Sequence, residues 1–259
     1  MMTMTKQISS AGSISVSSSI VYLELRAWTR QNSSRPNWVP ELSSYYSSLK
    51  KPTFTSHSWD DVYEREVANF EETGDEGEIW LVSFFSGKRE REQGPRGMTR
   101  RFGEDSIEKM VDWTLENVPI PSEPRILEIG SGNGTLLFAL RDAGYAAPHL
   151  SGIDYSPDAV RLALMVAQTR QDSERIAFHV CDFLSELPPP PAAAAASGGQ
   201  SLDAALEGSW DLLLDKGTYD AIALGEKDGS ENSPVAAYPV RASKLLRNNG
   251  YFLITCKLQ

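Results

Sequence analysis

The chain has 259 residues, 41% apolar and 23% charged, which is enough for one large domain with a substantial core. Its 25 Lys and Arg against 35 Asp and Glu give a net charge of −10, which excludes the basic face of a nucleic-acid binder. Two cysteines and three histidines exclude a disulfide framework and a four-ligand zinc site. No apolar run approaches the ~20 residues of a membrane span. We therefore expect an intracellular, cytoplasmic single-domain protein.

The charge is unevenly distributed along the chain. Residues 1–58 are Ser-rich, hold six basic and two acidic residues and show no sustained period, so we expect this segment to be disordered or weakly structured. Residues 81–101 also hold six basic and two acidic residues, with Gly and Pro between them, and are predicted to form a loop. The remaining chain carries a net charge of −18. The two basic segments thus differ in composition from the rest.

Regular hydrophobic periodicity begins at Trp59. Apolar residues at helical spacing predict helices over Trp59–Phe70 and Ile107–Val118. From Arg125 onward, short apolar runs alternate with amphipathic ones. The predicted strands are Arg125–Ile129, Leu150–Ile153, Ile176–Cys181, Trp210–Leu214 and Tyr251–Cys256, and the predicted helices are Thr135–Ala143, Pro157–Thr169 and Pro239–Arg247. Residues 188–209 begin with the low-complexity run PPPPAAAAASGGQ and are predicted to form a loop. This alternation predicts an α/β fold with a doubly wound, mostly parallel sheet.

The first strand runs into a glycine-rich loop, RILEIGSGNG, and then directly into a helix. Gly130, Gly132 and Gly134 permit positive φ and let a ligand approach the backbone closely. Dinucleotide-binding loops read G-x-G-x-x-G, whereas here the third glycine lies one position earlier and Glu128 precedes the first. The spacing therefore argues against a dinucleotide oxidoreductase.

The pattern E-x-G-x-G-x-G resembles motif I of the class I, seven-β-strand, S-adenosylmethionine-dependent methyltransferases. The resemblance implies a Rossmann-like fold with S-adenosylmethionine as the cofactor. It also implies that the loop with Asn133 accommodates the methionine part of the cofactor, and that Glu128 helps to hold its amino group, directly or through water.

Two further acids end the next strands. Asp154, followed by Tyr155, ends the second strand, where a carboxylate can accept both ribose hydroxyls. Asp182 follows the third strand, and in the methyltransferase class an acid there accepts from the adenine amino group while the adjacent Phe183 packs on the ring. Each acid alone could equally be a solvated strand end or a helix cap. Their order at successive strand ends favours a cofactor site.

The substrate class depends on a closer resemblance. The segments WDDVYEREVANFEETGDEGEIW (59–80), FGEDSIEKMVDW (102–113), LEIGSGNG (127–134), GIDYSPDAV (152–160), CDF (181–183) and DKGTYDAI (215–222) resemble the lysine methyltransferases that modify translation elongation factor 1-alpha. The resemblance implies that Asp215 holds and orients the substrate amine, with Tyr219 and Asp220 as second candidates. Lys216 could equally be a surface lysine and Tyr219 a core residue. Trp59, Tyr63 and Trp80 are expected to shape the lysine entrance.

The chain departs from this family pattern in two places. Residues 81–101 interrupt it and are interpreted as an insertion. The chain also stops a few residues after the fifth predicted strand, where the class continues through another helix and two strands, so the fold is expected to be truncated there. An unpaired fifth strand would expose a flat apolar edge.

These observations favour a protein-lysine N-methyltransferase that acts, as a monomer, on elongation factor 1-alpha, without metal, membrane or direct nucleic-acid partner. Two alternatives stay open: a small-molecule methyltransferase with the same cofactor site, and a protein that binds the cofactor without catalysis.

Overall fold

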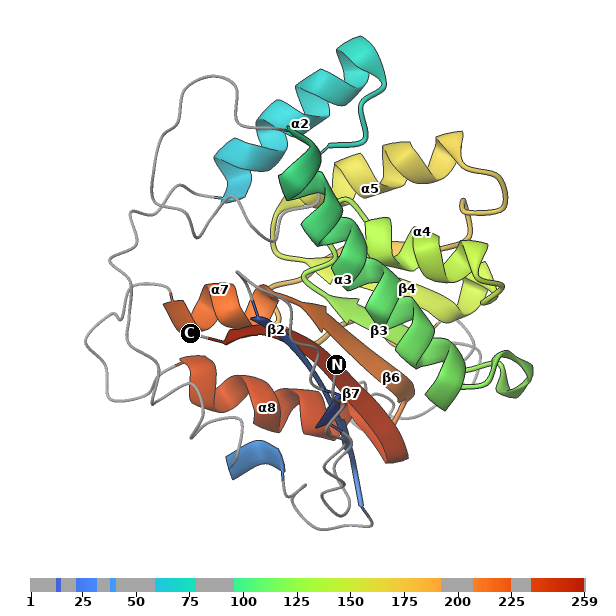
Figure 1. Ribbon diagram of the computed structural model, residues 1–259, viewed down its shortest axis with the longest axis vertical. Helices are drawn as coiled ribbons and strands as arrows, with labels where there is room; N and C mark the ends of the chain where they lie inside the picture. The colour runs from blue at the N-terminus through green and yellow to red at the C-terminus, as the bar shows by residue number, and fades with distance from the viewer. Residues whose placement is uncertain are drawn as a thin grey trace, which may run out of the picture.

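The computed structural model describes residues 13–14, 22–31, 38–40, 59–77, 96–191, 207–224 and 234–258. Within these ranges the chain forms a seven-stranded sheet in the order β1-β2-β7-β6-β3-β4-β5, with helices on both faces (Figure 1). The strands are β1 (Ser13–Ile14), β2 (Tyr22–Thr29), β3 (Ile126–Ile129), β4 (Leu150–Asp154), β5 (Ala177–Val180), β6 (Trp210–Lys216) and β7 (Leu246–Leu258). The helices are α2 (Trp59–Thr73), α3 (Arg96–Asn117), α4 (Thr135–Asp142), α5 (Pro157–Thr169), α7 (Thr218–Leu224) and α8 (Pro234–Leu245), with short 3₁₀ turns at Ile120–Ser122 and Ala147–His149.

Five strands form a parallel block, β7-β6-β3-β4-β5. The chain runs from β3 to β4 and β5 on one side and then crosses to β6 on the other side of β3. The predicted α/β, doubly wound, mostly parallel sheet is therefore confirmed. The order reverses beside β3, which is where sheets of this kind place their ligands.

Side chains alternate between the two faces of the sheet along each strand, so the apolar core is divided into two clusters, one on each face. Ile126 of β3 and Leu212 of β6 belong to a cluster with α3, α4 and α5, whereas their neighbours Leu127 and Leu213 belong to a cluster with α7 and α8. Figure 1 shows α3, α4 and α5 on one side of the sheet and α7 and α8 on the other. Because both faces are covered, the central strands are buried along their length and read as continuous apolar runs.

The structure corrects two predictions, because residues 22–29 of the segment expected to be disordered or weakly structured form a strand, and the last strand is not left unpaired. β2 pairs antiparallel with β7 from Tyr22 opposite Leu258 to Thr29 opposite Tyr251. Trp28 is 3% exposed, and its ring centroid lies 6.1 Å from that of Phe252. The pairing joins residues more than 200 positions apart, so a local pattern inside a Ser-rich segment could not reveal it.

Three predicted boundaries also change. α3 begins at Arg96, so residues 96–101 are helical where a loop was expected, while residues 81–95 lie outside the described residues. α8 begins at Pro234 and contains Pro239, which the sequence suggested as its first residue because proline is favoured there. β7 begins at Leu246, five residues before the predicted start, and pairs with β6 through an irregular register between Trp210 and Leu212.

None of the helices in the described ranges is long and apolar enough to cross a membrane.

Candidate functional site

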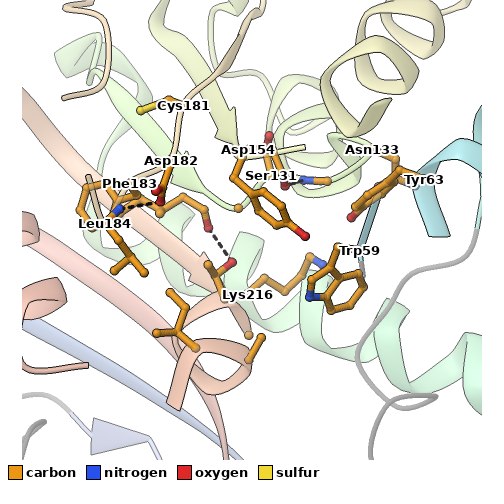
Figure 2. A pocket seen from close by; sticks show the side chains of 18 residues that line it. Trp59, Tyr63, Ser131, Asn133, Asp154, Cys181, Asp182, Phe183, Leu184 and Lys216 are labelled. Atoms are coloured by element: carbon orange, nitrogen blue, oxygen red, sulfur yellow. Dashed lines mark hydrogen bonds between the residues drawn. The ribbon is translucent and has the colours of Figure 1, made fainter. Parts of the chain in front are cut away.

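A cavity of about 390 Å³ opens at the carboxyl ends of the parallel strands, beside the point where the strand order reverses. Its walls come from residues 129–133 after β3, Asp154 and Tyr155 at the end of β4, residues 181–184 after β5, residues 216–218 with Ala221 and Ile222 after β6, and Trp59 and Tyr63 of α2. Figure 2 shows Asp182, Phe183 and Leu184 at one end of the cavity and Trp59, Tyr63 and Asn133 at the other, with Asp154 and Ser131 between them. The structure thus brings together most of the residues predicted for a cofactor site.

Each glycine of the loop after β3 has a positive φ, of 70° at Gly130, 53° at Gly132 and 82° at Gly134. Each also meets a neighbour that leaves no room for a Cβ atom. A Cβ would lie 1.9 Å from the Thr218 hydroxyl at Gly130, 2.5 Å from the Tyr63 hydroxyl at Gly132 and 2.7 Å from the Phe178 ring at Gly134. Gly134 does not line the cavity. The glycine spacing therefore reflects close packing within the protein as well as the shape of the site.

Asp154 ties this loop to the end of β4. One carboxylate oxygen accepts a hydrogen bond from the Gly132 amide at 2.9 Å, and the other accepts from the Ser156 amide at 3.0 Å. Burial raises the pKa of Asp154, and the hydrogen bonds from the Gly132 and Ser156 amides oppose that rise. Since an ionised carboxylate can accept about four hydrogen bonds, Asp154 keeps acceptor capacity toward the cavity that it lines.

Glu128 lies beneath the glycine loop and does not line the cavity. It is 0% exposed, and neither carboxylate oxygen has a hydrogen-bond partner in the described part of the chain. Burial raises its pKa to about 8, and the positive charge of Lys216 opposes this rise. The Ser131 hydroxyl, which does line the cavity, is likewise buried without a partner among the described residues. Such an acceptor set fits a ligand that brings N–H donors.

The segment after β5 forms the far wall. Asp182 lines the cavity, but its side chain also closes the local turn, accepting from the Leu184 amide at 3.0 Å (Figure 2) and from the Ser185 hydroxyl at 2.6 Å. Phe183 lines the cavity with 6% of its surface exposed. A flat apolar ring next to a carboxylate is suited to an aromatic base that carries an amino group.

The structure places Asp215 behind the cavity wall. Its carboxylate is 0% exposed and accepts hydrogen bonds from the amides of Thr218 at 2.7 Å and Tyr219 at 3.0 Å and from the Tyr238 hydroxyl. None of Asp215, Tyr219 and Asp220 lines the cavity. Asp215 instead ends a buried strand and turns inward to cap α7, and burial raises its pKa to about 7. Its contact with a substrate amine stays a prediction.

The entrance side is formed by α2. The rings of Trp59 and Tyr63 are stacked, with centroids 6.2 Å apart. The Asn133 side chain donates to the backbone carbonyl of Glu76 at 2.9 Å, and Arg170 pairs with the Glu76 carboxylate, so the segment after α2 is fastened to the glycine loop and to α5. Trp80, the third residue predicted here, lies outside the described residues.

Several lining residues were not singled out from the sequence. Ser131 lies inside the glycine motif and Thr218 inside the DKGT motif, so the motifs contained them without showing which side chains face inward. Lys216, for which a surface position was left open, also lines the cavity. Cys181 and Ile222 carry no chemical signal. No group of three or more His, Cys, Asp or Glu side chains in the part of the chain that the structure describes could hold a metal ion.

Comparison with known proteins adds four findings. A family model described as "Methyltransferase domain" matches residues 120–257. "Protein-lysine N-methyltransferase efm4" of Schizosaccharomyces pombe is 35% identical over 214 residues, which cover 78% of this chain and 74% of that protein. "EEF1A lysine methyltransferase 2" of Mus musculus is 32% identical over 201 residues, or 78% of this chain, and the match spans 64% of the mouse protein's own length. Among solved structures, the magnesium protoporphyrin IX methyltransferase of Synechocystis PCC 6803 with bound SAM shares 17% identity at a TM-score of 0.42, covering 74% of each chain.

Proposed function

Because this chain belongs to the class I methyltransferases, in the subfamily of the protein-lysine N-methyltransferases named above, we propose that it methylates a lysine of translation elongation factor 1-alpha with S-adenosylmethionine as the donor. One observation carries the proposal: a cavity at the carboxyl ends of β3, β4 and β5 is lined by Asp154, Asp182 and Phe183 in the order expected for this cofactor. The names of the two relatives supply the substrate class.

The residues present fit the proposed cofactor part by part. Asp154 would accept the ribose hydroxyls, and Phe183 with Asp182 would receive the adenine ring and its amino group. Ser131 and Glu128 are buried acceptors without partners among the described residues. Ser131, which lines the cavity, would receive the amino group of the methionine part, and Glu128, beneath the glycine loop, would hold it through water. The bound cofactor supplies an activated methyl group, so the protein has mainly to position the acceptor amine and exclude water.

The acceptor amine would enter along α2. The stacked faces of Trp59 and Tyr63, together with Tyr155 at the end of β4, offer aromatic surface, which attracts an ammonium cation. Asp215 would contribute indirectly: it lies behind the cavity lining and holds the turn after β6, which carries Lys216 and Thr218 into the cavity. Trp80 stays a predicted entrance residue.

The acidity of the chain is consistent with a basic protein substrate. Apart from residues 1–58 and 81–101, the chain carries −18, and complementary charge accelerates encounter. We expect the protein to act as a cytoplasmic monomer. Size-exclusion chromatography with light scattering measures the oligomeric state.

Transfer of a labelled methyl group from S-adenosylmethionine to purified elongation factor 1-alpha tests the proposal. We expect label in the elongation factor, and mass spectrometry of its peptides should locate it on a lysine. Asp154→Asn should reduce transfer at least about tenfold, because a charge-assisted contact to the ribose is lost. Asp112→Asn, which changes an exposed carboxylate of α3, is the matched control. The same reaction is run with a cell extract in place of the purified factor. An unlabelled elongation factor, with label only in small molecules of the extract, would contradict the proposal and favour the small-molecule alternative.

A further inference from the structure

Tyr238 of α8 contacts both walls of the cavity from behind. It is 0% exposed and does not itself line the cavity. Its hydroxyl donates a hydrogen bond to Asp215, and its ring lies edge-on to Phe183 with centroids 4.8 Å apart. Asp215 holds the turn after β6, whereas Phe183 belongs to the segment after β5. A single side chain therefore joins two walls that the sheet topology places on opposite sides of β3.

The contact with Asp215 continues to the glycine loop. The Asp215 carboxylate accepts the Thr218 amide at 2.7 Å, and the Thr218 hydroxyl donates to the Ile129 carbonyl at 2.9 Å. That hydroxyl occupies the space that a Cβ atom at Gly130 would need, 1.9 Å away. Displacement of Asp215 would therefore move Thr218 against the loop that forms the cofactor side of the cavity.

The contact with Phe183 comes from two residues one helical turn apart. Tyr238 meets one edge of the ring, and the guanidinium of Arg241 lies 5.6 Å from the ring centroid. Arg241 also donates to the backbone carbonyl of Glu186, which ends the turn begun by Asp182. α8 thus holds the Phe183 ring in place from the side that faces away from the cavity, through ring packing and a cation–π contact.

We infer that Tyr238 is a positioning residue for methyl transfer, which holds Asp215 with its hydroxyl and Phe183 with its ring so that the two cavity walls keep a fixed spacing. The inference rests on the proposed function, because the walls matter only if the cavity holds the methyl donor. It differs from the role expected of Asp215 from the sequence, since here the carboxylate acts on the protein backbone.

The electrostatic surroundings of Asp215 make this role measurable. The titratable groups that interact with it are Glu128 of β3, Tyr219 and Asp220 of α7, and Tyr238 of α8. Burial raises the pKa of Asp215 to about 7, and the hydroxyl of Tyr238 opposes that rise. Without the hydroxyl the pKa should rise by about one to two units, as expected for a lost bond to a charged acceptor. Asp215 would then take up a proton near neutral pH.

The test compares Tyr238→Phe with Tyr145→Phe. Tyr145 is 1% exposed and donates its hydroxyl to the Val118 carbonyl at 2.7 Å, so its variant loses a buried tyrosine hydroxyl away from the cavity. Binding of S-adenosylhomocysteine, methyl transfer to elongation factor 1-alpha and urea unfolding are measured from pH 6 to 9. We expect Tyr238→Phe to weaken binding about three- to tenfold at pH 7, to move the acid limb of the rate profile up by about one pH unit, and to lose stability increasingly above pH 7. Tyr145→Phe should show a pH-independent loss of stability only.

Identical pH dependence and cofactor affinity in the two variants would overturn the inference, even if both are less stable. If Tyr238→Phe does not fold, Asp215→Asn tests the same link from its other end, because it keeps the shape and removes the titration. The acid limb should then disappear, and its persistence would assign it to another carboxyl group and overturn the inference. A wild-type chain that binds no S-adenosylhomocysteine would contradict the proposed function itself, whereas normal wild-type activity with an unchanged Tyr238→Phe contradicts this inference alone.

Discussion

Glu128 is a carboxylate that the fold buries without a hydrogen-bond donor from the described residues. A buried, unpaired carboxylate is destabilising in its charged form, and its pKa rises to about 8 as a result. The folded-state pKa lies above the ordinary value, so the stabilisation that protonated Glu128 gives is complete below about pH 4.5 and is lost as the pH rises toward 8. A residue kept at this cost at the base of the cavity is a candidate for ligand binding.

Glu128→Gln should therefore separate stability from binding. We expect the difference in free energy of unfolding between the variant and wild type to grow in favour of the variant by on the order of 2–4 kcal/mol from pH 4 to pH 9, because the variant has no charge to bury. Its affinity for S-adenosylhomocysteine should fall at least about tenfold at pH 8, because a charge-assisted hydrogen bond is lost. Urea unfolding and calorimetry measure the two effects. Glu116→Gln, on the exposed face of α3, should change neither, and unaltered affinity in Glu128→Gln would remove Glu128 from the site.

At the scale of elements, α2 is the part of the site that comes from farthest away in the sequence. It brings Trp59 and Tyr63 to a cavity otherwise built from residues 129–222. Two ion pairs fasten it to α5, Glu71 with Arg161 and Glu76 with Arg170. The second pair also adjoins Asn133, so it connects α2 to the glycine loop.

Arg170→Ala should loosen this connection. We expect affinity for S-adenosylhomocysteine to fall about two- to fivefold, because Trp59 and Tyr63 would be held less firmly over the cavity, with little change in stability for a partly exposed pair. Arg141→Ala removes a comparable pair, with Asp172, that does not involve α2 and is the control. Equal effects of the two substitutions on affinity would refute a role for α2 in closing the site.

β2 is the second element with a structural role that the local sequence does not show. It covers the edge of β7, and Trp28 packs there with Trp38 and Phe252, with ring centroids 5.5–6.1 Å apart. A long unpaired edge favours association between chains. The antiparallel strand β2 therefore protects the parallel block as well as extending it.

Trp28→Ala should destabilise the protein by about 3–5 kcal/mol, the usual cost of truncating a buried aromatic side chain. It should also promote aggregation, because β2 would separate more readily from β7. Urea unfolding and size-exclusion chromatography measure the two effects. Leu115→Ala, at a position 41% exposed on α3, should have little effect on either. A monomeric variant of wild-type stability would show that the sheet does not depend on β2.

At the scale of the whole molecule, the net charge of −10 should influence the encounter with a protein substrate. If that substrate presents a basic surface, the specificity constant for methyl transfer should fall several-fold between about 20 mM and 200 mM salt, because salt screens long-range attraction. Affinity for S-adenosylhomocysteine, a small ligand in an enclosed site, should change far less. Kinetics at several ionic strengths, with calorimetry alongside, tests this expectation. A salt-independent specificity constant would contradict electrostatic steering.

The sequence by itself determined the parallel sheet and the position of the candidate cofactor site. Strands, helices and the glycine loop are local features, since hydrophobic period, glycine and strand-end acids can all be read within a few residues. Parallel topology then places the ends of successive strands at one edge, so Gly132, Asp154 and Asp182 could be assigned to one cavity before any contact was known.

Only the tertiary structure decided which way the side chains of the DKGT motif face and what covers β7. Asp215 turns inward because Tyr238, 23 residues later, and the amides of α7 meet it there, while Lys216 faces the cavity. β2 pairs with a strand at the opposite end of the chain. Both outcomes depend on contacts between distant segments, whose free energy is absent from any local window of sequence.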